Sequence, residues 1–340
     1  MQQNTYEHTG QTMVNERSVN TDPRENAVQG RPIYPGWQSR RRTPWRLLAI
    51  CAIALVVAWT IFSLTGGLSL TSMQKTLPTR AFSLSGHGTL VVNEINGNVH
   101  IHPGDTNQII VRGSEHAVGL ESSLNNLQVQ YAQSGNTVTV SSSENWALAG
   151  DSELSLDITV PASIDITIHN SSADATIDGI TGPIDASASS GNLELNDTNG
   201  PLNLNTSSGD ISLNNEHGSV SAHTTSGDIS ARGLTGPVNL STSSGNITLE
   251  QAQLSSQDHL QTTSGDIDVS GTLDPRGTYR METSSGNITL NLPATSSFQL
   301  STSSDSGELH NDFAATQTGG APYARIELQT SSGDMFVRRQ

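Results

Sequence analysis

The chain has 340 residues, a formal net charge of −16, 14% charged and 4% aromatic residues, and one cysteine, Cys51. This composition disfavours a helical bundle, because Ser, Thr, Asn and Gly are poor helix formers, and a compact α/β enzyme, which uses more Leu, Phe and charged residues. The acidic balance argues against a nucleic-acid partner, and a single cysteine cannot form an internal disulfide framework.

The first 45 residues differ in charge from the rest of the chain. Residues 1–46 carry seven Arg and four acidic residues, a net charge of +3, whereas residues 71–340 carry nine basic and 28 acidic residues, a net charge of −19. Residues 1–45 are polar, contain scattered prolines and show no apolar periodicity. We therefore predict a disordered cytoplasmic tail over 1–45.

An uncharged apolar run from Leu47 to Leu64 follows, and it predicts one transmembrane helix over 46–70. The longer version of this helix would span about 36 Å, which is enough to cross a hydrocarbon core. Positive charge lies mainly before the run, at Arg40, Arg41, Arg42 and Arg46. The positive-inside rule then predicts a single-pass protein of the cell membrane with a cytoplasmic N-terminus, a linker over 71–80 and an extracytoplasmic C-terminal domain.

Three other interpretations of this run are less favoured. A cleaved signal peptide would have a shorter polar segment before it and a small-x-small cleavage site after it. A lipoprotein would need an apolar stretch before Cys51, which the sequence lacks. A buried soluble helix would be amphipathic, and this run is not.

From about residue 164 the sequence repeats a turn of the type S/T-S-G-D/N, followed by an apolar-x-apolar pair. We predict structural turn positions at Gly191, Gly209, Gly227, Gly245, Gly265, Gly286 and Gly333. Three successive spacings are 18 residues, followed by 20 and 21. Such a period indicates a repeat architecture, and glycine at the turn would permit a positive φ.

Each 18-residue unit contains two short runs in which apolar residues alternate with polar ones, which is typical of strands. Stacking the units places Ile184, Leu202, Val220 and Val238 in one column, and Leu193, Ile211, Ile229 and Ile247 in another. We predict an all-β protein with a parallel β-helix-like solenoid over 164–340 and an N-terminal β cap region over 81–163. An antiparallel meander folded into a sandwich is the alternative, with Asn199-Gly200 as a hairpin turn. Arg338 and Arg339 follow the last predicted strand and would discourage end-to-end pairing.

The pattern resembles a bacterial family of β-strand-repeat domains of unknown function that carries the description "putative adhesin". The resemblance rests on Asn96–Ile101, on Leu156–Pro161 and on the repeated S-S-G-D/N-I-x-L turns, and it covers about residues 81–337. It implies a membrane-anchored or exported protein and brings no catalytic residues. Two departures are Ala173 at the first turn position and the irregular lengthening of the repeats after Gly245.

Candidate chemistry is sparse. His100 and His102 would share the outward face of one strand, but a metal site needs further ligands that the sequence does not place. Acids recur at the turns, as at Asp210 and Asp228, and calcium is the ion they would take; alternation with Asn weakens such a column, and hydrogen bonding of these side chains to their own turn is favoured. We predict no catalytic, cofactor or metal residues. A polysaccharide-active β-helix enzyme would need acids clustered with Arg or Lys on one face.

These observations predict a membrane-anchored extracytoplasmic β-repeat protein without catalysis, acting as an adhesin or surface-contact module. Its partners would be the membrane, through one helix, and a surface polysaccharide or another protein, with no nucleic acid. Binding would use many shallow hydrogen bonds along the polar strand faces. An envelope-sensing or regulatory membrane protein is the first alternative, and a polysaccharide-active enzyme is the second.

Overall fold

The computed structural model describes residues 52–57, 59–60, 71–93, 95–119, 127–144, 150–255 and 257–340. The chain divides into two compact units, Met1–Leu68 and Ser69–Gln340. In the first unit, residues 52–57 and 59–60 are helical. No helix within the described ranges has both the length and the apolar character needed to span a bilayer. The predicted tail, most of the predicted span and the four arginines that set its topology lie outside the described residues.

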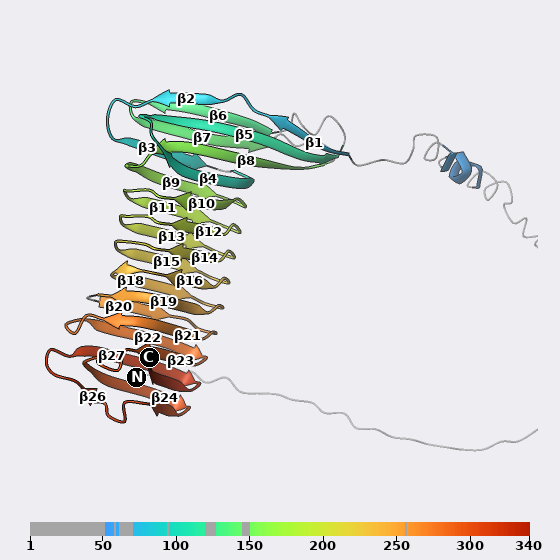
Figure 1. The fold of residues 1–340 in the computed structure, drawn as a ribbon. Coiled ribbons are helices and arrows are strands. Elements are labelled where there is room, and N and C mark those ends of the chain that lie inside the picture. Colours follow the sequence, from blue (N-terminus) through green and yellow to red (C-terminus); the bar gives the residue numbers. More distant parts are fainter. Residues whose placement is uncertain are drawn as a thin grey trace, which may run out of the picture. The chain divides into compact units, whose positions relative to one another are not determined.

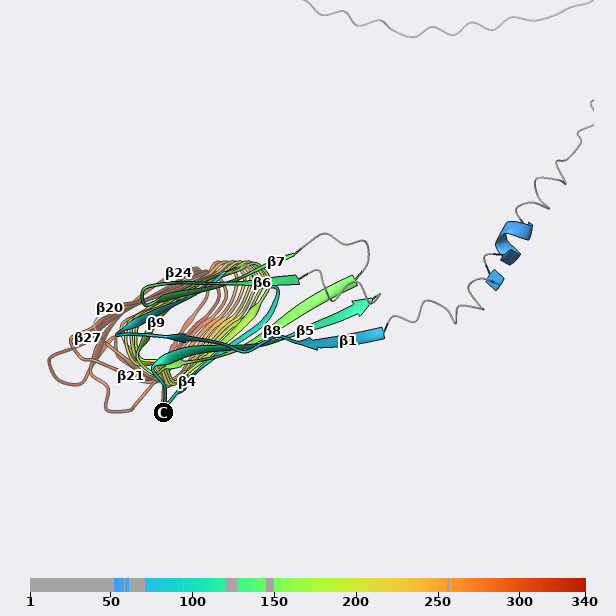
Figure 2. The same ribbon diagram turned by 90° about the horizontal axis from the view of Figure 1, so that it is seen from above.

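The second unit consists of two β-sheets, sheet A and sheet B, that run the length of a stack of coils (Figure 1). Among the described residues, sheet A has 15 strands and sheet B has 13. Seen along the stack, the two sheets face each other across a narrow interior (Figure 2). The fold is therefore all-β, as predicted.

Sheet A contains, in spatial order, β1 (Thr71–Thr76), β5 (Gln108–Gly119), β8 (Gly150–Pro161), β4 (Gly97–Gly104), β10 (Asp174–Asp178), β12 (Leu193–Asn196), β14 (Ile211–Asn214), β16 (Ile229–Arg232), β19 (Ile247–Leu254), β21 (Ile267–Leu273), β23 (Ile288–Leu292), β28 (Met335–Arg339) and β25 (Leu309–Asn311). Two short strands lie beside this path: β2 (Arg80–Ser83) pairs with β5, and β17 (Thr235–Gly236) pairs with β19.

Sheet B contains, in spatial order, β26 (Gln317–Thr318), β24 (Phe298–Ser306), β27 (Ala324–Ser332), β22 (Thr278–Ser285), β20 (Gln257–Gln261), β18 (Val238–Thr242), β15 (Val220–Thr224), β13 (Leu202–Thr206), β11 (Ile184–Ala188), β9 (Ile164–Asn170), β3 (Gly88–Asn93), β7 (Thr137–Glu144) and β6 (Leu127–Ser134).

Each repeat contributes one strand to sheet B and the next strand to sheet A, so that consecutive repeats stack as coils. The pairing is parallel and in register: Ile184 lies opposite Leu202, and Leu193 lies opposite Ile211. Both predicted columns continue in this way to Val238 and Ile247. The parallel arrangement confirms repeated strands stacked as a solenoid and excludes the antiparallel sandwich for these repeats.

The alternation of apolar and polar residues along each strand decides which side chains enter the core. In β13, Leu202 and Leu204 are 3% and 0% exposed, whereas Asn203 between them is exposed. The same pattern recurs in β15 and β18. Because strand side chains point alternately to opposite faces, each sheet buries its aliphatic face against the other sheet and presents a polar face to water.

The N-terminal end of the stack does not follow chain order. β3 lies between β7 and β9, and β4 lies between β8 and β10. The first coil of the chain is therefore in register with the repeats, with Leu90 opposite Ile166 and Val99 opposite Ala175. Antiparallel pairing occurs further out, where β5 pairs with β8 and β6 pairs with β7.

The C-terminal end has the same inversion. β27 lies between β22 and β24, and β28 lies between β23 and β25. Arg338 and Arg339 belong to β28, which is paired on both sides. β25 pairs only with Met335–Val337, so Arg338 and Arg339 have register partners on β23 alone, at Asn291 and Leu292. The expectation that these two arginines discourage end-to-end pairing stays a prediction.

Candidate functional site on the polar sheet faces

The predicted turn glycines form a column in which successive coils approach very closely. A Cβ added to Gly209 would lie 1.9 Å from the carbonyl oxygen of Gly191, and one added to Gly227 would lie 2.0 Å from that of Gly209. Of the seven predicted positions, only Gly333 has a φ in the left-handed region, at 152°. Close coil stacking, rather than a positive φ, is therefore the main reason that these turns require glycine.

Ala173, the first departure from the pattern, occupies the same column one coil before Gly191 and is fully buried. A second glycine column, which sequence reasoning missed, lies at the opposite turn. It consists of Gly182, Gly200, Gly218 and Gly236, which have φ between 133° and 153°. This column combines a left-handed backbone with close stacking, since a Cβ on Gly200 would lie 2.3 Å from the carbonyl oxygen of Gly182.

A column of buried threonines ties each glycine turn to its neighbour. The Thr224 hydroxyl accepts the Gly227 N–H at 3.1 Å and donates to the Gly209 carbonyl at 3.0 Å. The same donation to the turn glycine of the neighbouring coil is made by Thr206, Thr242, Thr262, Thr283 and Thr330. The repeated T-x-x-G spacing thus satisfies backbone groups that would otherwise be buried without a partner.

The Asp and Asn residues after these glycines form a continuous ladder. The Oδ1 atom of Asn192 accepts the backbone N–H of Asp210 at 2.8 Å, and that of Asp210 accepts the N–H of Asp228 at 2.9 Å. In spatial order the ladder comprises Asp174, Asn192, Asp210, Asp228, Asn246, Asp266, Asn287 and Asp334, and it ends on the N–H of Glu308.

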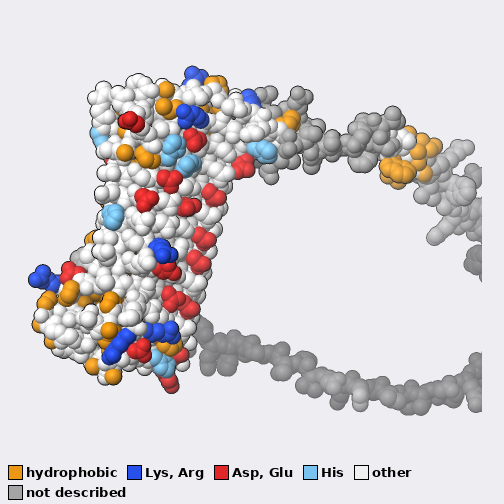
Figure 3. Space-filling view, in the orientation of Figure 1, with side chains coloured by type: hydrophobic (Ala, Val, Ile, Leu, Met, Phe, Trp, Pro, Cys, Tyr) orange, Lys and Arg blue, Asp and Glu red, His pale blue; other side chains and the backbone are white. Residues whose placement is uncertain are grey.

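This geometry corrects the expectation that each side chain bonds its own turn, because the acceptor serves the next coil instead. Asp and Asn alternate freely because both supply the same Oδ1 acceptor. The result is a file of acidic side chains along one edge of the stack (Figure 3). Across the described part of the chain, no group of three or more His, Cys, Asp or Glu side chains has the arrangement of a metal site.

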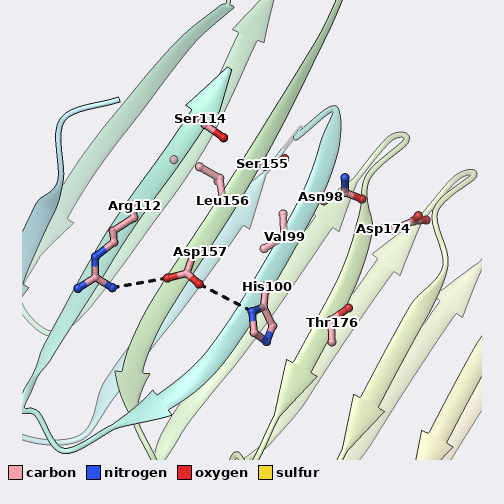
Figure 4. A pocket seen from close by; sticks show the side chains of 11 residues that line it. Asn98, Val99, His100, Arg112, Ser114, Ser155, Leu156, Asp157, Asp174 and Thr176 are labelled. Carbon is pink, nitrogen blue, oxygen red and sulfur yellow. Dashed lines mark ion pairs between the residues drawn. The ribbon is translucent and has the colours of Figure 1, made fainter. Parts of the chain in front are cut away.

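A cluster of charged side chains occupies the outward face of sheet A, on β4, β5, β8 and β10 (Figure 4). His100 Nε2 lies 2.7 Å from Asp178 Oδ2, and its Nδ1 lies 3.8 Å from Asp157 Oδ2. Arg112 Nη1 lies 3.6 Å from Asp157 Oδ1. As predicted, His102 shares the outward face with His100, and the ring centroids are 5.2 Å apart.

His100, Arg112 and Asp157 line a pocket of about 420 Å³, together with Asn98 and Thr176. Partial burial acts to raise the pKa of Asp178, but hydrogen bonds from Asn196 and His100 and the nearby imidazoles outweigh it and lower the pKa below its ordinary value. Both nitrogens of His100 face carboxylates, whereas nucleophilic catalysis would pair one of them with a hydroxyl or thiol.

Within the described repeats, two buried carboxyl groups, Glu216 and Asp258, interrupt the apolar columns, and the sequence analysis did not predict either. Glu216 is 1% exposed and accepts hydrogen bonds from the Thr198 backbone N–H at 3.2 Å and from the Thr198 hydroxyl. Asp258 is 3% exposed and accepts the Val238 N–H at 2.7 Å. Burial raises the pKa of each to about 7. The sequence could have indicated Asp258, because it is an acid at the position of a column that is otherwise apolar and contains Val238.

Residues 87–338 match the family model described as Toastrack DUF4097. No curated protein matches.

Similar solved structures include a putative adhesin from Bacteroides fragilis (14% identity, 78% of this chain and 97% of that chain covered, TM-score 0.41) and a putative lipid binding protein from Parabacteroides distasonis (14%, 77% and 96%, TM-score 0.38). A putative adhesin from Parabacteroides merdae is a third (12%, 77% and 96%, TM-score 0.35). None of these three descriptions names an enzyme. At these identities and TM-scores no residue role is transferred to this chain.

Proposed function

The chain belongs to the Toastrack DUF4097 family, and from this premise we propose that it is a membrane-anchored, extracytoplasmic contact module that binds a surface polymer without catalysis. Residues 87–338, the part matched by the family, contain the stacked coils that would make the contact.

The observation that carries the proposal is the regular array of polar side chains on the outward faces of parallel strands. In sheet B, Asn203, Ser221 and Asn239 lie opposite one another on successive strands and are exposed. Neighbouring strands are about 4.8 Å apart, so hydroxyl and amide groups repeat at that spacing along the stack. Many weak, equally spaced hydrogen bonds suit an extended polymer, for which repetition supplies avidity.

The first unit supports the membrane part of the proposal. Its described helical residues expose large apolar side chains, with Ile53, Leu55 and Trp59 at 63%, 71% and 72%. Such side chains are unfavourable in water and favourable in lipid. They belong to the uncharged run from Leu47 to Leu64, which the arginines at 40–42 precede.

Protease treatment of intact cells tests the location, using the full-length chain with a C-terminal tag. Loss of the tag from intact cells, with a cytoplasmic marker retained, is the expected result. A strain that produces the protein and a strain that lacks it are then compared for retention on immobilised envelope polysaccharide. Protection of the tag until lysis in cells that have a single membrane, or equal retention of both strains, would overturn the proposal.

A further inference from the structure

The inverted C-terminal coil builds a groove from segments that are distant in sequence. Because β27 lies between β22 and β24, Arg325 is the register partner of Thr278 on one side and of Gln299 on the other. These three residues line a pocket of about 370 Å³ together with Arg276 and Tyr323. They also line an adjoining pocket of about 400 Å³. The two pockets share these residues and therefore form one elongated groove, the C-terminal groove.

The C-terminal groove carries positive charge on an acidic molecule. Arg276 and Arg325 are exposed, and neither guanidinium has a carboxylate within 4.0 Å among the residues the structure describes. One acid, Glu327, also lines the adjoining pocket, but it is paired with Arg280 beside the groove at 2.9 Å. Arg280 is paired with Glu282 as well. Basic and apolar side chains lie together over the C-terminal coils (Figure 3).

The only acid in the adjacent turn is already engaged, since Asp274 Oδ1 accepts the backbone N–H of Arg276 at 2.9 Å. The two guanidinium groups are thus available to an anion from outside. A guanidinium binds a carboxylate or sulfate through paired hydrogen bonds, and such charge-assisted bonds are about twice as strong as neutral ones.

The remaining lining residues indicate what carries that anion. Tyr323 provides an aromatic surface, Gln299 an amide and Thr278 a hydroxyl, and Ser301 continues the row of hydroxyl groups into the adjoining pocket. A compact inorganic anion would use only the arginines, whereas an elongated groove with flat apolar and hydrogen-bonding groups suits a chain of sugar rings. We infer that the C-terminal groove binds an acidic oligosaccharide, with its carboxylate or sulfate groups on Arg276 and Arg325.

This inference rests on the proposed function and names the class of polymer. It is tested by titrating the full-length chain, purified in mild detergent, with oligogalacturonate, with a sulfated heparin oligosaccharide and with a neutral xylo-oligosaccharide. Calorimetry measures each dissociation constant. The variants are Arg276→Gln, Arg325→Gln and Tyr323→Ala, with Arg232→Gln as the matched control, since Arg232 is an exposed arginine of the other sheet that pairs with Glu250.

The expected result is binding of at least one acidic probe, little binding of the neutral probe, and a dissociation constant about tenfold higher in each groove arginine variant but unchanged in Arg232→Gln. Carboxylated and sulfated probes then separate the two anion types. Equal binding of neutral and acidic probes, or an equal loss in Arg232→Gln, would overturn the inference while leaving surface contact by the polar faces intact. Arginine-dependent binding by a chain that proves inaccessible on cells would support the groove and overturn the proposed location. Thermal midpoints equal to that of the unmodified chain show that each variant is folded.

Discussion

The Oδ1 atom of Asp210 lies 2.9 Å from the backbone nitrogen of Asp228, 18 residues along the chain and one coil further in the stack. The contact repeats between neighbouring coils through Asp or Asn and extends across the inverted C-terminal coil to Glu308. A side chain that looks like a local turn residue in sequence therefore acts as a vertical connection between coils.

Replacing Asp210 by Ala should destabilise the stack, whereas Asp210→Asn should not. The Ala variant leaves the Asp228 N–H without its acceptor, at a cost of about 1–2 kcal/mol, while Asn keeps Oδ1 and removes one like charge from the acidic file. Urea midpoints of the full-length chain measure both. Equal destabilisation by Ala and Asn would show that the carboxylate charge, rather than the acceptor, matters.

Replacing Gly227 by Ala should strongly destabilise the fold, because the new Cβ would lie 2.0 Å from the Gly209 carbonyl oxygen. The Cβ is fixed directly to the backbone of one coil, and the carbonyl oxygen belongs to the backbone of the neighbouring coil. Relief therefore requires the coils to separate, at a cost of about 3 kcal/mol or more. Gly320→Ala is the control, since nothing lies within 4 Å of its added Cβ. The midpoint of thermal unfolding should fall strongly for Gly227→Ala and stay unchanged for Gly320→Ala. An unchanged midpoint in Gly227→Ala would contradict the steric argument.

Replacing Thr224 by Val should cost about 1–3 kcal/mol although the shape is retained, because the Gly227 N–H and the Gly209 carbonyl both lose their partner in a buried position. Thr224→Ser keeps the hydroxyl and should cost less. Native-state hydrogen exchange at the Gly227 amide provides the local readout, with faster exchange expected in Val than in Ser. Unchanged protection in the Val variant would argue against the threonine column.

Stability should fall as the pH rises from about 4 to about 7, in part because of Glu216 and Asp258. Burial raises the pKa of each to about 7 in the folded chain, from 4.5 and 3.8, so the folded state holds these protons more tightly than the unfolded state does. The stabilisation is greatest below the unfolded pKa and is lost as the pH rises through the folded pKa. Each group contributes on the order of 3–4 kcal/mol to this change.

Glu216→Gln cannot ionise and should therefore flatten the pH dependence of the urea midpoint while preserving an acceptor for Thr198. The relevant quantity is the difference between the unmodified chain and the variant at each pH, because other acids titrate in both. Asp178 is one of these, and its lowered pKa acts at lower pH with the opposite sign. If the urea midpoints of the unmodified chain and of Glu216→Gln changed in parallel with pH, Glu216 would not titrate in this pH range.

The amino-acid sequence by itself determined the repeat period, the strands and the two inward columns from Ile184 and Leu193. Parallel in-register stacking places each residue above its equivalent one period later, so apolar positions that recur every 18 residues must share one core. The outward placement of His100 and His102 followed from the same alternation. The resemblance to a family of β-strand-repeat domains rested on the same repeated turns, and the family match over residues 87–338 agrees with it.

Only the tertiary structure decided the order of the coils at the two ends, because those pairings join strands that are not neighbours in the repeat. It placed β3 and β4 inside the stack and Arg325 between Thr278 and Gln299, although Arg325 is 47 residues from Thr278 along the chain. It also showed why the turns need glycine and where the Asp and Asn side chains bond, since both depend on the close distance between coils. Residues that act within one period can be predicted from a periodic sequence, whereas contacts across an inversion of the chain depend on packing that has no period.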